Sequence, residues 1–416
     1  MQTLAQLHAG ELKGAKRLVL SEDLTSFPEE IFDLAETLEI LDLSNNSLCE
    51  LPDLSRLTNL RIAFFFYNRF VALPSFRGCE NLTMLGFKGN QIETFDEDIL
   101  PLGINWLILT DNRLKSLPRS IGKLTKLQKC ALAGNRLEAL PEEMAACRNL
   151  ELLRFSANRL ESIPSWLLKL PKLSWLAFSG NPCIKEQKFP LQAIAYETLE
   201  VKEKLGSGAS GDIFRAYSAT HDEEVALKLF KGAITSDGYA HDEMNACMSA
   251  GEHPNLIKVL AKIEEDERLG LLLEYIPDIY RNLGLPPDFE TCTRDTFKEG
   301  STLEIESILE IAKAIASAAE HLHERGLMHG DLYAHNILIN EEDHCYLGDF
   351  GAASFYEAHE KEFEKIEVRA FGCLLEDMLS LCPTKEGDIY ERLEQLRERC
   401  MNEKVEERPL FSEMMF

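Results

Sequence analysis

Leucine and asparagine recur at a fixed interval through the first 184 residues of the chain. In the clearest unit, the frame L-x-x-L-x-L-x-x-N-x-L is filled by Leu38, Leu41, Leu43, Asn46 and Leu48. Each interval predicts one short strand and one turn, and such units must stack because a single unit cannot bury its own apolar face. The asparagines, spaced 22 or 23 residues apart, are Asn46, Asn68, Asn90, Asn112, Asn135, Asn158 and Asn181.

The first unit, Leu18 to Pro28, lacks the asparagine, as a capping unit would. The whole pattern resembles the leucine-rich repeat family over roughly residues 16–184. This resemblance implies an α/β solenoid in which short strands line one side. It also implies that each asparagine side chain bonds backbone groups where a strand turns away.

The strand residues that this frame turns toward the concave side include many apolar and aromatic side chains. Large apolar patches on a protein surface mark interfaces. Two interpretations stay open: the face binds a protein partner, or the second half of the chain or another copy covers it. The residues are Ile62, Phe64, Phe66, Tyr67, Met84, Trp106, Ile108, Leu152 and Trp175.

The pattern changes near residue 196, where alternating strands and then longer helices replace the repeat. We expect residues 1–184 to form the repeat domain, 185–195 a short linker that is no free tether, and 196–416 a second domain of strands and helices. Helices are predicted over Tyr239 to Ala250 and over Leu303 to Arg325. Gly326 would end the second helix, as a C-cap glycine does.

A glycine-rich turn and a strand lysine open the second domain. Glycines let backbone N–H groups approach phosphate oxygens closely. Lys228 ends the apolar run Val225-Ala226-Leu227-Lys228, where an unpaired lysine is costly. Glu243 has the best spacing for its partner, and Asp242 competes for that role. The glycines of the turn are Gly206, Gly208 and Gly211.

Further along, His329-Gly330-Asp331 is followed by Asn336 and by Asp349-Phe350-Gly351. The order and spacing of the glycine turn, the strand lysine and these three groups resemble the protein kinase family. The resemblance runs from about residue 196 nearly to the end of the chain, and it implies a two-lobed α+β fold for residues 196–416. We therefore identify the sequence as similar to soluble, bacterial-type leucine-rich repeat protein kinases.

The resemblance implies ATP and Mg²⁺ as cofactors and a role for each matching residue. Asp331 would accept or orient the proton of the acceptor hydroxyl, and Lys228 would hold phosphate oxygens. Asn336 and Asp349 would supply hard oxygen ligands to Mg²⁺. Adenine would contact the backbone of Glu274 and Ile276 and the side chains of Ile213, Ala226 and Leu338.

Four features depart from the kinase pattern. Gly330 replaces the arginine that reads a phosphorylated activation loop, which predicts activity without such phosphorylation. Tyr333 replaces a lysine, and Glu367 replaces an aspartate that anchors the catalytic loop. Only 15 residues separate Gly351 from Glu367. No A-P-E triplet is present, and Glu357 is a candidate partner for Arg408.

These observations predict a protein kinase for which serine or threonine is favoured over tyrosine, with the repeats as a protein-binding module. Two alternatives stay open. His-Gly-Asp and the short segment also fit a small-molecule kinase similar to aminoglycoside phosphotransferases. A nucleotide-binding pseudokinase scaffold is the third interpretation. Retention of Lys228, Asp331, Asn336 and Asp349 together argues against it. The segment Arg281 to Phe297 has no assigned role.

Composition narrows the partners and the location. The 416 residues carry a formal net charge of −26, and an acidic surface repels nucleic acid. Eleven cysteines without any C-x-x-C pair argue against disulfides or zinc and favour a reducing cytoplasm. Glu11 and Lys13 exclude a signal peptide, and no apolar run of about 18 residues occurs. We expect a cytoplasmic protein without membrane contact, and its oligomeric state stays open.

Overall fold

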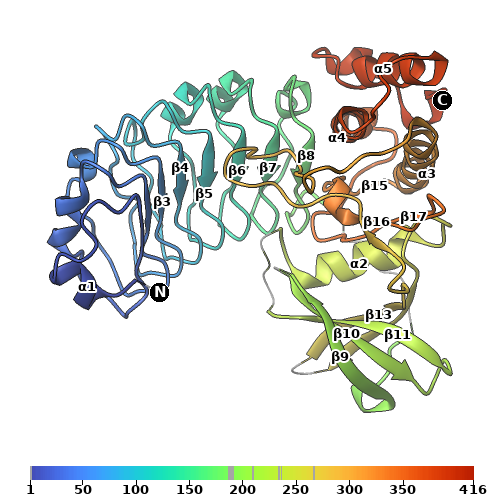
Figure 1. Cartoon of the computed structure of the whole chain (residues 1–416), viewed down its shortest axis with the longest axis horizontal. Helices are drawn as coiled ribbons and strands as arrows, with labels where there is room; N and C mark the ends of the chain where they lie inside the picture. The colour runs from blue at the N-terminus through green and yellow to red at the C-terminus, as the bar shows by residue number, and fades with distance from the viewer. Residues whose placement is uncertain (1, 186–191, 209, 233–234, 236, 266–267) are drawn as a thin grey trace. The chain divides into compact units, whose positions relative to one another are not determined.

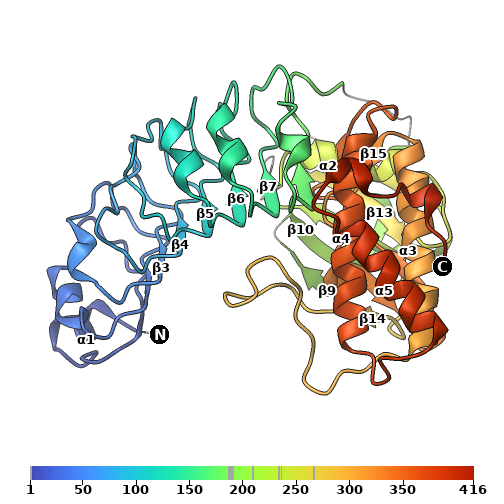
Figure 2. The same cartoon turned by 90° about the horizontal axis from the view of Figure 1, so that it is seen from above.

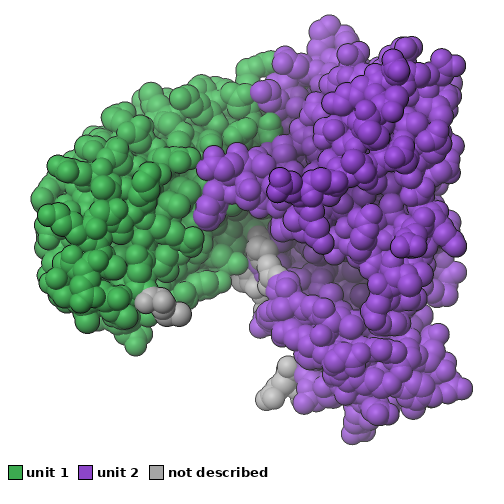
Figure 3. Space-filling view, viewed as in Figure 1, with its two compact units in different colours: residues 1–170, 181–183 green, residues 171–180, 184–416 purple. Residues whose placement is uncertain are grey.

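The computed structural model describes residues 2–185, 192–208, 210–232, 235, 237–265 and 268–416. Within it the chain packs as two compact units (Figure 3). The first unit comprises residues 1–170 and 181–183, and the second comprises residues 171–180 and 184–416.

The first unit contains seven parallel strands, which follow one another in chain order (Figure 1). The registers align the central residue of each strand with that of the next, and these residues are fully buried. The strand side of each repeat thus forms one continuous core, as expected for a solenoid. The strands are β1 (Arg17–Val19), β2 (Ile40–Asp42), β3 (Ile62–Phe64), β4 (Met84–Gly86), β5 (Trp106–Ile108), β6 (Lys129–Ala131) and β7 (Leu152–Arg154).

The repeated asparagines join each unit to the one before it. Asn135 is typical: its Oδ1 accepts from Leu114 N at 3.0 Å, and its Nδ2 donates to Leu109 O and Leu132 O, both at 2.9 Å. All seven asparagines are buried, so each amide replaces water for backbone groups that the turn would leave unpaired. The bonding expected of these side chains is confirmed.

Short helices occupy the other side of the repeats and the N-terminal end. At that end, α1 (Leu4–His8) begins with a capping box between Thr3 and Gln6. The first repeat lacks an asparagine of its own, but Asn46 accepts from Glu22 N at 3.1 Å and Leu24 N at 2.9 Å. The 3-10 helices are η1 (Glu29–Leu34), η2 (Leu54–Arg56), η3 (Arg119–Lys123), η4 (Glu142–Ala146) and η5 (Leu167–Lys169).

The second unit begins with a five-stranded antiparallel sheet in the order β12-β13-β11-β10-β9. Val225 and Leu227 point to one face, where they pack with Ala216, Ala261 and Leu272. Because side chains alternate along a strand, Ala226 and Lys228 point to the opposite face. The strands are β9 (Leu199–Ser207), β10 (Gly211–Ser218), β11 (Glu223–Phe230), β12 (Val259–Glu265) and β13 (Arg268–Glu274).

Helices complete the second unit (Figures 1 and 2). α2 (Ala240–Ala250) packs against β12 and β13, and it matches the helix predicted there. α3 (Ile305–Glu324) begins two residues later than predicted, and Gly326 follows it with a φ of 66°. α4 (Lys361–Ser380) packs against both α3 and α5 (Asp388–Cys400).

Short strands, one before α3 and four between α3 and α4, carry the loops with the candidate chemistry. β15 pairs with β18, and β16 pairs with both β14 and β17. Two 3-10 helices, η8 (Val405–Glu407) and η9 (Phe411–Glu413), lie near the C-terminus, and η6 (Tyr196–Thr198) precedes β9. The strands are β14 (Arg281–Asn282), β15 (Leu327–Met328), β16 (Ile337–Ile339), β17 (Cys345–Leu347) and β18 (Ser354–Phe355).

The end of the repeat pattern belongs to the second unit by packing. β8 (Trp175–Ala177) is buried there, and Trp175 is only 1% exposed. For Trp175 the second half of the chain covers the concave side, which is one of the two interpretations left open, because its ring stacks on Tyr333. Of the other concave residues, Ile62, Phe64 and Met84 form a buried cluster of the first unit.

The expected linker, residues 185–195, is described only in part, because residues 186–191 lie outside the described residues. Its last part is bound to the sheet of the second unit. Ile194 N donates to Lys262 O at 3.0 Å, Lys262 N donates to Gln192 O at 3.1 Å, and Ile194 joins the core. Residues 192–195 are thus packed structure rather than a tether.

Two further features concern the helices and the cysteines. Within the described part of the chain, no helix has both the length and the apolar character needed to cross a lipid bilayer. All eleven cysteines are free thiols, and burial raises the pKa of several of them, including Cys79 to about 11.

Replacing a ladder asparagine should destabilise the repeats. We expect Asn135→Ala to lower the free energy of unfolding by about 3 kcal/mol, because it leaves a buried N–H and two carbonyls without their partner. Asn149→Ala, which removes one accessible bond to Thr125 O, should cost less than about 1 kcal/mol. Urea unfolding of both variants measures the difference, and equal costs would contradict the ladder's role.

Candidate active site

Lys228 lies at the centre of a cluster of charged side chains. It projects from β11 and forms an ion pair with Glu243 of α2, and both side chains are buried. Its Nζ also lies 3.7 Å from Asp349 Oδ1. Asp242, the competing candidate, precedes Glu243 on the helix by one residue, and it is Glu243 that pairs with Lys228. One ammonium therefore connects the sheet, α2 and the Asp349 segment.

These contacts shift the pKa values of the three groups. Burial by itself lowers the pKa of Lys228. The carboxylates of Glu243 and Asp349 raise it by a larger amount, so the pKa of Lys228 ends above its ordinary value. Burial raises the pKa of Glu243 to about 7. Loss of hydration raises the pKa of Asp349, but Lys228 lowers it more, so it ends below its ordinary value. The side chains of Lys228 and Asp349 are thus charged at neutral pH.

Asp331 and Asn336 belong to the loop between β15 and β16. Asn336 Nδ2 donates to Asp331 O at 2.9 Å and to Asp331 Oδ2 at 3.1 Å. These bonds fix the carboxylate of Asp331 and turn the amide oxygen of Asn336 away from it. The Asn336 carbonyl accepts from Gly348 N at 3.0 Å, which places the residue beside Asp349. The loop and the Asp349 segment therefore converge.

His329 is a structural residue of this loop. Its Nδ1 accepts from Asp331 N at 3.3 Å, so its Nε2 carries the proton and donates to Gly348 O at 3.0 Å. The ring also packs against Phe350, with centroids 4.9 Å apart. His329 is fully buried and ties the backbone of Asp331 to the segment that carries Asp349.

Glu367 anchors the loop from below, although the family pattern has an aspartate there. Its Oε2 accepts from His329 N at 3.0 Å, and its Oε1 accepts from Gly330 N at 2.6 Å. His323 Nε2 of α3 lies 2.8 Å from the same carboxylate. Burial raises the pKa of Glu367, but His323 and the backbone donors lower it more, so the carboxylate stays charged.

Asp349 has a strained backbone. Its φ of 59° lies in the left-handed region, which a residue with a Cβ adopts at a cost. Gly351 N donates to Asp349 Oδ1 at 3.3 Å. The side chain is 53% exposed, in contrast to the buried Lys228 and Glu243 beside it. An accessible carboxylate held by strain is suited to binding a ligand.

The glycine turn lies between β9 and β10. A Cβ at Gly211 would lie 2.5 Å from Leu229 O, so this glycine is required by strand packing. A Cβ on Gly206 would meet nothing within 4 Å, so there is open space beside this residue. Lys231 Nζ donates to Ser207 Oγ at 2.7 Å and to Gly208 O at 3.1 Å, and so stabilises the turn.

The residues expected around adenine share one face of the sheet and one neighbouring strand. Ile213 pairs with Lys228, and Ala226 pairs with Leu273, so all four point to the same side. Leu338 is half-buried on β16. Glu274 N donates to Lys258 O at 2.9 Å, so this N–H group is already paired within the protein.

Sequence reasoning missed two residues of the segment 281–297 that stabilise the loop between β15 and β16. Asp295 is buried and accepts from His335 N at 2.9 Å, and its Oδ1 lies 2.7 Å from His335 Nδ1. Arg294 anchors this segment to Glu376 and Asp377 of α4. Asp295 is 40 residues from His335 in the chain, and no local sequence pattern predicts such a contact.

The expected pair between Glu357 and Arg408 was wrong. Glu357 pairs with Lys185 at 2.7 Å. Arg408 is buried and donates to the carbonyls of Asn402, Lys365 and Pro171. Three carbonyls satisfy the guanidinium without an ion pair.

The donor set fits ATP and Mg²⁺. Asn336 and Asp349 offer an amide oxygen and an accessible carboxylate, which are hard ligands of the kind that Mg²⁺ binds while phosphates and water fill its other positions. Across the described ranges, no group of three or more His, Cys, Asp or Glu side chains is arranged to hold a metal ion by itself. A site completed by a nucleotide matches these ligands.

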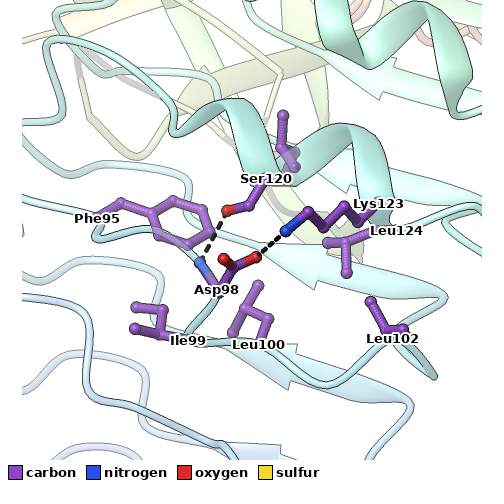
Figure 4. Close-up of a pocket in the computed structure, with 9 residues that line it drawn as sticks. Phe95, Asp98, Ile99, Leu100, Leu102, Ser120, Lys123 and Leu124 are labelled. Atoms are coloured by element: carbon purple, nitrogen blue, oxygen red, sulfur yellow. Dashed lines mark hydrogen bonds and ion pairs between the residues drawn. The ribbon is translucent and has the colours of Figure 1, made fainter.

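A separate small pocket lies in the first unit (Figure 4). Asp98 N donates there to Ser120 Oγ at 2.9 Å, and Lys123 Nζ lies 2.7 Å from Asp98 Oδ1. Leucine, isoleucine and phenylalanine side chains make up most of its lining. It contains none of the residues expected to bind nucleotide, so the candidate chemistry belongs to the second unit.

Comparison with known proteins defines the class. Residues 199–371 match the model of the protein kinase domain, and residues 37–60 match a leucine-rich repeat. The chain thus contains a leucine-rich repeat followed by a protein kinase domain, as the fold and the site indicate.

Among similar proteins are two kinase-domain relatives. Fibroblast growth factor receptor 1 of Xenopus laevis is 27% identical over 177 residues, which cover 39% of this chain and 22% of the relative. Serine/threonine-protein kinase fray1 of Dictyostelium discoideum is 28% identical over 171 residues, which cover 41% and 28%. The chain spans less than a third of the length of either relative.

An isosteric change at Glu367 should destabilise the second unit. In Glu367→Gln one acceptor oxygen becomes an NH₂ group that faces a backbone N–H donor of the loop. We expect a loss of about 3 kcal/mol in the free energy of unfolding, because a buried donor loses its partner. Glu362→Gln, on an exposed turn of α4, is the control. Equal midpoints of chemical denaturation for the two variants would refute the anchor.

Proposed function

We propose that the second unit transfers the γ-phosphoryl group of ATP, with Mg²⁺, to a hydroxyl group of a protein, and that serine or threonine is preferred over tyrosine. The observation that carries this proposal is the double contact of Lys228 with Glu243 and Asp349, beside an Asp331 that Asn336 holds in place. The match to the protein kinase domain supports a protein acceptor. The family relative fray1, whose name describes a serine/threonine kinase, supports the preference.

Each residue has a physical task in this proposal. Asp331 accepts or orients the proton of the acceptor hydroxyl, since its carboxylate is fixed by Asn336. Lys228 is held by Glu243 and offers positive charge to phosphate oxygens. Bound Mg²⁺ would neutralise charge on the phosphates, and Asn336 and Asp349 would hold it. The turn that contains Gly206 and Gly208, where a Cβ would meet little, would cover the phosphates.

The nucleoside end would bind to the face of the sheet that carries Lys228. Ile213 and Ala226 would contact adenine from the sheet, and Leu338 from the opposite side. The carbonyl of Glu274 and the N–H of Ile276 would supply its two polar contacts. Such a combination of apolar contact and few polar groups is usual for sites that bind small aromatic ligands.

The repeats would serve as the module that binds a protein partner. The first unit presents Ile40, Phe66, Trp106 and Ile108, partly exposed, around the buried Phe64 group. Aromatic side chains of this kind dominate the energetics of protein interfaces. We infer a protein substrate or regulator on this face, and the acidic net charge makes a nucleic-acid partner unfavourable. A cytoplasmic location suits the free thiols.

The alternative of a small-molecule kinase is supported by the short segment that precedes α4. Only 15 residues separate Gly351 from Glu367, and α4 begins at Lys361, so little chain is available to support a peptide. A small hydroxylated acceptor would need no such platform. The assay below separates a protein acceptor from a small one, and a scaffold that binds nucleotide without turnover would label neither.

Changing Asp331 should stop transfer without preventing nucleotide binding. We expect Asp331→Asn to lower kcat by about 10³-fold, the range of general acid–base contributions, while the Kd for ATP changes less than about threefold. Asp388→Asn, at an exposed position of α5, should retain full activity. Transfer of ³²P from ATP to a mixed panel of proteins, aminoglycosides and sugars measures this.

In that panel, labelling of protein alone supports the proposal, and labelling of a small molecule alone favours the alternative. Undiminished labelling by Asp331→Asn would refute the assignment of Asp331. No labelling by the unmodified chain, combined with ATP binding, would favour the scaffold.

Activity should not depend on prior phosphorylation. Gly330 provides no cation to read a phosphate, so a phosphatase-treated sample should transfer phosphate at its first turnover with the same rate as an untreated one. Single-turnover kinetics of both samples, checked by intact mass, measure this. A lag in the treated sample that a second kinase abolishes would contradict the prediction.

A further inference from the structure

Residues 171–180 end the repeat pattern but pack inside the second unit, against the loops that carry the candidate chemistry. Trp175 is the centre of this contact. Its ring stacks on that of Tyr333, with centroids 4.4 Å apart and planes 6° from parallel, and its Nε1 donates to Leu332 O at 3.1 Å. Leu332 and Tyr333 directly follow Asp331. One buried tryptophan therefore restrains the two residues next to the candidate base.

The same segment also holds the chain that follows Asp349-Phe350-Gly351. Ser354 Oγ accepts from Phe178 N at 3.0 Å and from Ser179 N at 3.1 Å, and it donates to Ala352 O at 3.2 Å. Ser354 is fully buried, so this hydroxyl is satisfied by protein groups alone. The backbone N–H groups of residues 178 and 179 thus take the place of water at the Ser354 hydroxyl of β18.

Three backbones meet at Gly330. Its φ is 74°, and a Cβ there would lie 2.5 Å from Leu176 O and 2.7 Å from Ala352 O. The catalytic loop, the segment after Asp349 and β8 approach so closely that no side chain fits between them. In related kinases this position carries the arginine that binds a phosphorylated residue, whereas here the Leu176 carbonyl occupies the space.

Both ends of the segment are fixed to other parts of the same unit. Arg408 donates to Pro171 O at 2.7 Å, and the buried Arg369 of α4 donates to Ser174 Oγ at 2.8 Å. At the other end a Cβ on Gly180 would lie 2.7 Å from atoms of Tyr239 and Asp242, at the start of the helix that carries Glu243. The segment thus contacts the loop after Asp331, the chain after Asp349, α4 and the start of α2.

We propose that residues 171–180 are an intramolecular positioning element of the kinase site, with Trp175 and Ser354 as its main positioning residues. The last unit of the repeat pattern holds the catalytic loop and the segment after Asp349 in place, and so performs the task that a phosphorylated residue performs in switched kinases. This inference rests on the proposed phosphoryl transfer. It makes the end of the repeat array a part of the enzyme rather than of the binding module.

The test uses the full chain and the acceptor that it labels best. We expect Trp175→Ala to lower kcat by about 10²-fold, as a displaced catalytic group does, with the KM for ATP changed less than about threefold. Trp175→Phe keeps the ring contact with Tyr333 and loses one hydrogen bond, so kcat should stay within about tenfold of the unmodified value. Trp166→Ala, half-buried in the first unit, is the control and should keep full activity.

A second variant and a second readout guard against loss of folding. Ser354→Ala leaves Trp175 in place and should lower kcat at least about tenfold, because two backbone donors lose their acceptor. Hydrogen exchange should increase over residues 330–336 and 349–356 in both variants, and stay unchanged around the asparagines of the first unit.

The outcomes separate the two claims. Lower kcat with retained ATP binding in Ser354→Ala and Trp175→Ala, rescued in Trp175→Phe, supports the proposal. Normal kcat in folded Trp175→Ala or Ser354→Ala overturns it and leaves the kinase function intact. Should Trp175→Ala unfold, Ser354→Ala and Trp175→Phe decide by the same criterion. An unmodified chain that binds ATP but labels no acceptor rejects the proposed function and this inference with it.

Discussion

A single buried carboxylate holds the candidate chemistry in position. Glu367 accepts from the backbone N–H groups of His329 and Gly330, and it lies within ion-pair distance of His323. Asp331 follows immediately, and Asn336 is bonded to it. A buried carboxylate without partners would be strongly unfavourable, so these contacts are mutually required. The orientation of the loop therefore follows from the need to satisfy one charge in the core of the unit.

The first unit solves a similar problem with neutral groups. Each turn after a strand leaves backbone N–H and C=O groups in a region without water, and the repeated asparagines satisfy them. The amide can both donate and accept, which a carboxylate or a hydroxyl does less well. This explains why the same residue type recurs at an interval that the stacking of units sets.

The segment 171–180 shows how one pattern can serve two packing environments. Its sequence continues the repeat, and Leu173 and Leu176 are buried as in the other units. Its remaining side chains differ in what they contact. Trp175 stacks on Tyr333 and Phe178 packs against Phe363, with centroids 5.1 Å apart. Trp106 and Trp175 are both the first residue of a repeat strand. Trp106 packs within the repeats, whereas Trp175 packs against the loop that carries Tyr333.

Local sequence patterns were sufficient to predict a residue's structural role wherever that role depends on its neighbours in the chain. The asparagine interval predicted the parallel strands, the apolar run predicted the strand of Lys228, and spacing selected Glu243 over Asp242. The kinase resemblance also located Asp331, Asn336 and Asp349, whose roles as catalytic and metal-binding groups stay predictions. Periodicity and short motifs record such relations because they arise within one element or between adjacent ones.

Only the tertiary structure decided the contacts between distant segments. Asp295 on His335, Ser354 under residues 178 and 179, and Arg408 on carbonyls rather than on Glu357 have no local signature. The sequence also left open what covers Trp175, and the structure shows that it is Tyr333. The frame specifies on which side of a strand a residue lies, whereas burial depends on what the rest of the chain places against that side. The sequence thus determined the elements and the candidate chemistry, and long-range packing decided which groups hold that chemistry in place.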